Sequence, residues 1–255
     1  MAVLDAQTLQ RLLPRIERGE LSETQREGLF WALKKELNTR CAEDGVFWLQ
    51  FARTRDEADV EDAIKAVPLH EAYVGDLWRG LVEHQVSIIA KSRQMFVSWE
   101  IALFCVWWAR YKPNQAIYIQ MQGWPDAVAM TCMPAGGYEG RMQFIENHLP
   151  EWMRVKYKAS EGRMAYPNGS IIQALAGGAN QIRSKTYSLY VGDEFAFCEE
   201  QDKIWTAVAP LIQKGSKAII VSTPNGVDNQ FATLWHGYPV GQQMQANAML
   251  QDAAS

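Results

Sequence analysis

From Leu69 onward, short apolar runs alternate with longer stretches of helical spacing, and this alternation limits the possible folds more than any other feature. The apolar runs are Val86–Ala90, Ala116–Met121, Ile171–Leu175, Ser188–Val191 and Ala218–Ser222. The helix-like stretches are Trp99–Arg110, Pro125–Met133, Met142–Tyr157 and Gln201–Ile212. Strands that alternate with helices form a mainly parallel sheet covered on both faces. We therefore predict an α/β fold over residues 66–240, with ligands bound beyond the carboxyl ends of the strands.

Three smaller segments complete the predicted organisation. Residues 1–65 are expected to be helical, because Leu9–Ile16 and Ser22–Asn38 place apolar residues at helical spacing. Ser22 with Gln25 forms a capping-box pattern at the start of the second helix. The turn signal Pro-Asn-Gly-Ser at residues 167–170 predicts an added antiparallel hairpin. Residues 241–255 are rich in Gln, Asn and Ala, and we expect them to be poorly ordered.

The segment KSRQMFVS follows the first apolar run and precedes a helical stretch. A strand, a loop carrying Lys and a hydroxyl, then a helix is the layout of a phosphate-binding loop. Such a loop sets backbone N–H groups and a helix N-terminus against a polyphosphate. Phe96 and Val97 stand where the usual G-x-x-x-x-G-K-[ST] pattern has glycine and lysine, and the lysine is at the head of the loop. The expected nucleotide-binding residues are Lys91, Ser92, Arg93, Gln94, Met95, Phe96, Val97 and Ser98.

The segment LYVGDEFAF is an apolar run that ends in two adjacent carboxylates, Asp193 and Glu194. Adjacent carboxylates at a strand end repel each other, so a bound cation is a physical reason for the pair. We expect Asp193 and the Ser98 hydroxyl to hold Mg²⁺, and Glu194 to orient or deprotonate an attacking water. The loop and the carboxylates, in this order and each after a strand, indicate a nucleoside-triphosphate hydrolase.

Three ordered motifs resemble those of the large terminase subunits of tailed phages, the ATP-driven motors that pump DNA into an empty capsid. KSRQMFVS resembles their variant Walker A segment, in which the lysine comes early, and VGDEFAF resembles their Walker B segment. VSTPNG at residues 221–226 resembles their coupling motif. The resemblance covers roughly Leu69 to Gly237 and implies a P-loop NTPase (ASCE-like) fold.

The resemblance also implies roles for particular residues. Ser222, Thr223 and Asn225 would sense the γ-phosphate and relay hydrolysis. Arg93 would reach the phosphates or sense their loss, with a salt bridge to an acidic neighbour as the structural alternative. Gln94 would contact the γ-phosphate or only satisfy the loop backbone. Arg183, ten residues before Asp193, would act on the ATP of a neighbouring subunit, with a salt bridge as the structural alternative.

The resemblance implies Mg²⁺ and ATP as cofactors. It also implies a homo-oligomeric ring in the host cytoplasm, with double-stranded DNA, the portal protein and the small terminase subunit as its partners. The chain is expected to be the ATPase half alone, without the nuclease domain. The net charge is −4, so the positive charge for any DNA contact must be local or supplied by assembly. Locally, Arg154, Lys156, Lys158 and Arg163 form either a solvated basic face or a DNA-contacting one. No window reaches the roughly 20 apolar residues that span a bilayer, and scattered Cys and His residues argue against zinc.

Two other functions remain open from the sequence. One is a helicase-like or other ring ATPase that acts on nucleic acid and shares the same core. The other is a degenerate nucleotide-binding assembly module in which Phe96 and Val97 have ended hydrolysis. Retention of Asp193 and Glu194 argues against the degenerate module, because a site without hydrolysis has no use for a water-activating glutamate.

Overall fold

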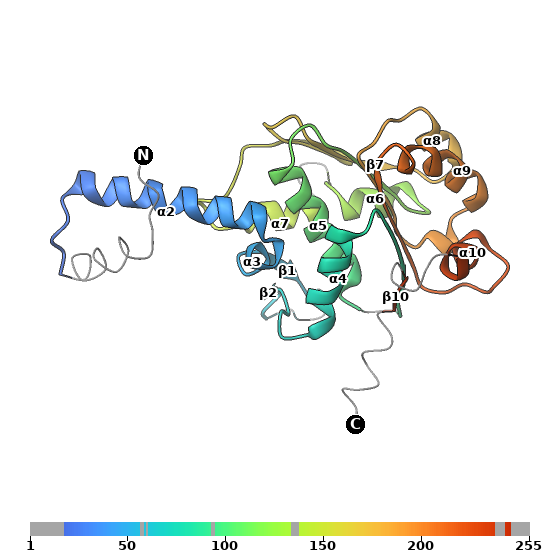
Figure 1. Cartoon of the computed structure of the whole chain (residues 1–255), viewed down its shortest axis with the longest axis horizontal. Coiled ribbons are helices and arrows are strands. Elements are labelled where there is room, and N and C mark those ends of the chain that lie inside the picture. Colours follow the sequence, from blue (N-terminus) through green and yellow to red (C-terminus); the bar gives the residue numbers. More distant parts are fainter. Residues whose placement is uncertain are drawn as a thin grey trace, which may run out of the picture.

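A twisted sheet runs through the centre of the computed structural model, which describes residues 18–56, 59, 61–92, 95–133, 138–237 and 243–245 (Figure 1). In these residues the sheet has eight strands, in the order β10-β3-β9-β8-β4-β7-β6-β5. Their bounds are β10 Gln243–Gln245, β3 Val86–Ala90, β9 Lys217–Ser222, β8 Leu189–Gly192, β4 Ala116–Gln120, β7 Ile171–Leu175, β6 Arg163–Ala165 and β5 Lys158–Ser160. Neighbours from β10 to β7 pair in parallel, and β6 and β5 add an antiparallel edge. The predicted α/β fold and the predicted hairpin are confirmed.

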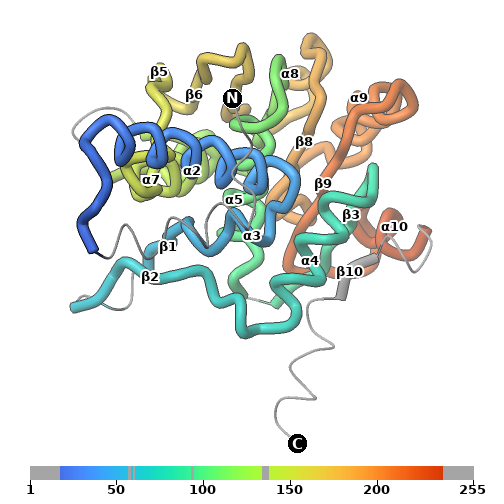
Figure 2. The backbone as a smooth tube through the Cα atoms, turned by 60° about the vertical axis from the view of Figure 1, so that its left-hand side comes forward, coloured from blue at the N-terminus to red at the C-terminus, as the bar shows by residue number. Residues whose placement is uncertain are grey.

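The strand order brings the predicted motifs together. β9 lies between β3 and β8, as Figure 2 shows. Ala90 of β3 pairs with Ser222 of β9, and Gly192 of β8 pairs with Ile220. The three strands therefore end at the same edge of the sheet, so the residues that follow them are neighbours in space although they lie far apart in sequence.

Helices cover both faces of the sheet (Figure 1). On one face lie α3 (Gly45–Leu49), α4 (Ala72–Glu83), α5 (Val97–Tyr111) and α7 (Arg141–Asn147); on the other lie α8 (Ala179–Arg183), α9 (Gln201–Ile212) and α10 (Gln230–Gly237). Successive strand residues alternate between the two cores: Ile219 and Val221 pack toward α5, whereas Ile220 packs toward α9. This alternation follows from the period of two in a strand. Fully buried strands explain why their sequences are continuous apolar runs.

The N-terminal part combines a helix with a small ribbon. Helix α2 (Glu23–Glu43) begins with the predicted capping box, in which Ser22 Oγ accepts from Gln25 N–H at 3.3 Å. It projects from the body of the protein in Figure 1. The expectation of helix throughout residues 1–65 is wrong for the segment after α3, because β1 (Arg53–Arg55) and β2 (Ile64–Ala66) form an antiparallel ribbon. The predicted helix at Leu9–Ile16 lies outside the described residues.

Two further element predictions need correction. The helix expected over Met142–Tyr157 ends at Asn147. Pro150 follows closely, and a proline disfavours helical backbone in the residue before it. In the segment expected to be poorly ordered, Gln243–Gln245 form strand β10 beside β3, and the remainder of residues 241–255 lies outside the described residues.

A buried ion pair joins α5 to α7. Arg110 Nη1 donates to Glu146 Oε1, and the two side chains are only 4% and 1% exposed. Tyr166 O–H donates to the other Glu146 oxygen at 3.4 Å. The pair fixes the position of α7 against α5, the helix that follows the predicted phosphate-binding loop.

We predict that Arg110→Met destabilises the fold by about 3–5 kcal/mol, because it leaves the Glu146 carboxylate buried without its cation. Denaturant unfolding followed by circular dichroism measures this change. Arg79→Met, at an exposed position on α4, is the matched control and should change stability by less than about 0.5 kcal/mol. A similar small change for both variants would show that the buried pair does not support the packing of α7.

Candidate active site

A cavity of about 990 Å³ opens at the carboxyl edge of the sheet. One wall is formed by the ends of β3 and β8 and the start of α5, which contribute Lys91, Ser98, Asp193 and Glu194. The facing wall includes residues of the β1–β2 ribbon, and Arg141 at the start of α7. The position agrees with the expectation that a parallel sheet binds ligands beyond its carboxyl ends.

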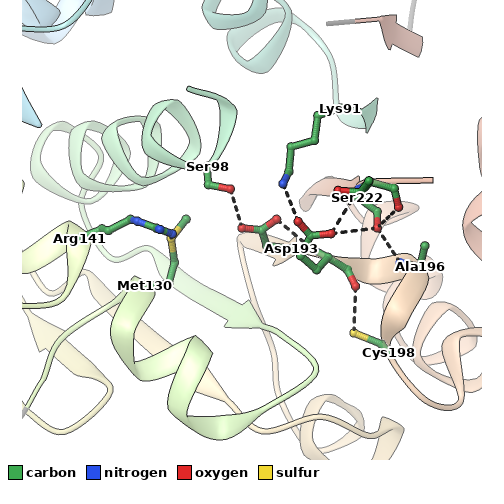
Figure 3. A network of polar contacts seen from close by, with 10 residues as sticks. Lys91, Ser98, Met130, Arg141, Asp193, Ala196, Cys198 and Ser222 are labelled. Carbon is green, nitrogen blue, oxygen red and sulfur yellow. Dashed lines mark hydrogen bonds and ion pairs between the residues drawn. The ribbon is translucent and has the colours of Figure 1, made fainter. Parts of the chain in front are cut away.

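Asp193 is held in a fixed orientation directly after β8 (Figure 3). The residue is 1% exposed, its Oδ2 accepts from Ser98 Oγ at 3.0 Å, and its Oδ1 accepts from the backbone N–H of Glu194 at 2.9 Å. Burial raises the pKa of Asp193; the Lys91 charge opposes this effect and the Glu194 charge adds to it. Because burial disfavours the charged form of the Asp193 carboxylate, a nearby cation would stabilise that form.

Glu194 makes the contacts that join the three motifs. Its Oε1 accepts from Lys91 Nζ at 2.6 Å, and its Oε2 accepts from the backbone N–H of Thr223 at 3.2 Å. Burial favours a higher pKa for Glu194, but the Lys91 ammonium and the Thr223 N–H together hold the pKa below its usual value. Glu194 is thus held in its charged form, and Lys91 neutralises that charge.

The backbone at Glu194 is unusual. It has φ 50° and ψ 41°, in the left-handed region, and it leads directly into the 3-10 turn η1 (Phe195–Phe197). For a residue with a Cβ this conformation costs roughly 1–3 kcal/mol, and such residues cluster at functional sites. The turn directs the carboxylate back toward Lys91 and β9 instead of along the strand.

The predicted phosphate-binding loop accommodates Phe96 and Val97 without backbone strain at Phe96. Phe96 has φ −62° and ψ −4°, a right-handed conformation in which a side chain is tolerated, so glycine is not required there. Val97 is fully buried in the core, whereas Lys91 lines the cavity. Helix α5 begins without a side-chain cap, which leaves its first N–H groups available to an anion. Met95 lines the cavity, and Ser92 is partly buried; Arg93 and Gln94 lie outside the described residues.

The end of β9 is tied to the carboxylates through the expected coupling residues. Ser222 Oγ lies 3.5 Å from Glu194 Oε2 and accepts from the backbone N–H of Ala196 at 3.0 Å. Asn225 Nδ2 donates to the Ala196 carbonyl at 3.2 Å. Thr223 contributes its backbone N–H to Glu194, as described above. A displacement of Glu194 would therefore be transmitted to η1 and to the segment before α10.

Arg183 lies away from this cavity. It is exposed at the end of α8 and donates to Asn180 Oδ1 at 3.4 Å. An arginine that this chain does place in the cavity is Arg141, which the motifs did not indicate because it lies in none of them. Sequence reasoning also missed the β1–β2 ribbon, which contributes Arg55 and Lys65 to the facing wall.

Residues 68–78, which precede β3, divide between the cavity and the core. Pro68 lines the cavity, whereas Trp78 is 2% exposed and packs against Phe104 and Trp107. The core position is the one expected for most tryptophans.

The donor atoms around Asp193 suit a hard divalent cation. Asp193 and Ser98 present oxygens beside each other, and Mg²⁺ commonly binds through one or two protein oxygens, waters and substrate phosphates. In the described part of the chain, no three His, Cys, Asp or Glu residues gather as a metal cage. The same part contains no helix with the length and apolar character needed to cross a bilayer.

Comparison with known proteins gives one family and several similar folds. Residues 82–246 match the family described as "Terminase large subunit, T4likevirus-type, N-terminal". The large terminase of bacteriophage HK97 is 13% identical with a TM-score of 0.55, and the match covers 80% of this chain and 43% of that one. The large terminase of a thermophilic bacteriophage, solved in complex with ADP, is 11% identical with a TM-score of 0.50, covering 72% of this chain and 46% of that one. At these identities the likeness establishes the shared fold, and the chain spans less than half of either protein.

We predict that Lys91→Ala weakens the binding of a magnesium-bound ATP analogue by about tenfold or more, since a hydrogen bond between charged groups contributes roughly 1.5–3 kcal/mol. Isothermal titration calorimetry measures the affinity. Val97→Ala is the control: it removes buried methyl groups from the position that usually holds lysine, and the affinity should stay near that of the parent. Equal losses in the two variants would remove Lys91 from phosphate binding.

Proposed function

The chain belongs to the T4likevirus-type large terminase family, N-terminal domain, and from this membership we propose that it hydrolyses MgATP to drive double-stranded DNA into a procapsid. The observation that carries the proposal is the contact of Lys91 with Glu194 beside Asp193 and Ser98. One cavity thus contains a cation for phosphates, oxygens for Mg²⁺ and a carboxylate for water.

We infer that Lys91 exchanges partners during the reaction. Its ammonium neutralises Glu194 at 2.6 Å, and polyphosphate oxygens compete for the same three donors. When Lys91 turns to the phosphates, Glu194 loses the main interaction that lowers its pKa and becomes a stronger base. Binding of the substrate would therefore activate the residue that accepts or orients the proton of the attacking water.

Asp193 and Ser98 would hold Mg²⁺, which when bound neutralises charge on the β- and γ-phosphates. Asp193 gains most from this ion, because burial disfavours its charge and raises its pKa. Phosphoryl transfer needs little covalent chemistry from the protein, so positioning and charge stabilisation carry the catalysis.

We propose that β9 relays the state of the site. Glu194 contacts the Thr223 N–H and lies close to the Ser222 hydroxyl, and Ser222 in turn holds the Ala196 N–H. Departure of the phosphate would return Lys91 to Glu194 and shift this network. Movement of η1 and of the segment before α10 is the step that we expect to couple hydrolysis to DNA movement.

The assembly remains part of the proposal. The family relation supports a ring of identical subunits that works with a portal protein, a small terminase subunit and DNA in the host cytoplasm. The basic residues Arg154, Lys156, Lys158 and Arg163 are exposed near the antiparallel edge of the sheet, where they serve either as a solvated face or as a DNA contact. The degenerate assembly module is disfavoured, because the backbone accepts Phe96 without strain and Lys91 supplies the charge that Val97 lacks.

We predict that Glu194→Gln still binds MgATP but loses turnover by at least about 100-fold, the lower range for removal of a general base. Steady-state phosphate release and nucleotide titration measure the two quantities. Glu199→Gln changes an exposed carboxylate nearby and should leave both unchanged. Turnover equal to that of the parent would exclude Glu194 from the mechanism.

We also predict that Arg183 acts on the site of a neighbouring subunit, so that the isolated domain is slow and assembly accelerates it. An arginine supplied in trans contributes roughly 10³–10⁵ in rate in well-studied GTPases. Arg183→Ala protein mixed with Glu194→Gln protein should exceed the summed activity of the two variants, because some interfaces pair an intact site with an intact arginine.

The matched control is a mixture of Lys91→Ala and Glu194→Gln proteins. Both changes affect the same cavity of their own subunit, so this mixture should not recover activity. If the activity of the Arg183→Ala and Glu194→Gln mixture also equals the sum of the two separate activities, under conditions where the parent assembles, Arg183 does not act across the interface.

A further inference from the structure

We propose that Arg141 binds the terminal phosphate of a nucleoside triphosphate in its own subunit, so that the site distinguishes triphosphate from diphosphate. This proposal rests on the proposed function and adds a residue that lies outside all three motifs. Arg141 is the first residue of α7 and lines the same cavity as Lys91, Ser98, Asp193 and Glu194.

The position of Arg141 suits the terminal phosphate. In Figure 3 its side chain extends from α7 toward the side of the cavity on which Ser98 and Asp193 lie. The terminal phosphate must lie within reach of a water held by Glu194 and of an ion held by Asp193. Arg141 lines the same cavity, and in the view of Figure 3 it and Lys91 lie on different sides of Asp193, so we expect it to reach that phosphate from another side than Lys91.

The guanidinium is oriented by neutral groups. It lies 5.7 Å from the centre of the Trp99 ring and donates to Met130 Sδ at 3.8 Å. Contact with the Trp99 ring and the Met130 thioether positions the plane of the guanidinium. These neutral groups satisfy few of its five N–H donors. Trp99 directly follows Ser98, so the helix that begins at the phosphate-binding loop also positions Arg141.

The other cations of this cavity already have oxygen partners. Lys65 pairs with two aspartates of the segment between β1 and β2, Lys91 pairs with Glu194, and Arg55 donates to a backbone carbonyl at 3.3 Å. For Arg141, no acidic side chain of the described residues lies within ion-pair distance. Since arginine has no acceptor and its fork matches phosphate oxygens, a partly buried guanidinium with only neutral contacts suits an anionic ligand.

The charge balance of the cavity leads to the same ligand. Asp193 and Glu194 carry two negative charges at the end of β8, where Lys91 is the cation in contact with Glu194, and a triphosphate adds further negative charge. Mg²⁺ held by Asp193 would compensate part of it, and Arg141 would supply another cation for the terminal phosphate. A diphosphate has no third phosphate, so it would not make the contact with Arg141.

The test compares two ligands on one variant. Arg141→Gln should weaken the binding of a magnesium-bound, non-hydrolysable ATP analogue by about tenfold or more, while ADP affinity changes by less than about twofold. Arg141→Lys keeps the charge but not the fork and should lose less of the analogue's affinity. Arg79→Gln, at an exposed site on α4, should leave both affinities unchanged.

Equal losses for the analogue and ADP, or no loss for either, would overturn the proposal. Thermal unfolding of each variant shows whether it is folded. If Arg141→Gln does not fold, the affinities for the analogue and for ADP are compared in Arg141→Lys instead. A parent protein that binds neither ligand would instead contradict the proposed function. A mixture of Arg141→Gln with Glu194→Gln should not exceed the sum of the two activities, and an increase above that sum would show that Arg141 acts on a neighbour.

Discussion

The ion pair between Lys91 and Glu194 is the interaction on which the rest of the site depends. Two adjacent carboxylates follow β8 at the carboxyl edge of the sheet, and the Lys91 ammonium contacts one of them, Glu194, at 2.6 Å. Burial raises the pKa of Asp193, while the Lys91 contact helps hold that of Glu194 down, so the two neighbours differ in proton affinity. In the proposed mechanism this difference in pKa would separate a metal-binding carboxylate, Asp193, from a base, Glu194, and the position of the Lys91 ammonium would control it.

The sheet order makes that pair possible. Lys91 follows β3 and Glu194 follows β8, and β9 between them contributes Ser222 and the Thr223 N–H. The left-handed backbone at Glu194 turns the carboxylate toward both neighbouring strands. A ligand that attracts Lys91 would thus change the contacts of β9 without any direct contact to it, which gives the fold a physical route from phosphate binding to movement.

Much of this arrangement could be predicted from the sequence, because local periodicity determines it. The runs at Val86–Ala90 and Ile171–Leu175 and the helix at Gln201–Ile212 have the predicted bounds, and Ser22 with Gln25 forms the predicted cap. The β1–β2 ribbon was missed because its strands have three residues each, too few for a clear alternation. Arg141 was missed because its role depends on Trp99 and Met130, which only tertiary packing brings beside it. The sequence predicted that Lys91 belongs to the loop. Its contact with Glu194 could be recognised only once the order of the strands in the sheet was known.

If Lys91 leaves Glu194 for the phosphates when nucleotide binds, a crystal structure with Mg²⁺ and a non-hydrolysable ATP analogue will show the exchange. We expect Lys91 Nζ within hydrogen-bond distance of a β- or γ-phosphate oxygen, the ion bound by Asp193 and Ser98, and no contact between Glu194 and Lys91. A complex in which Lys91 still contacts Glu194 while another residue binds the phosphates would contradict it.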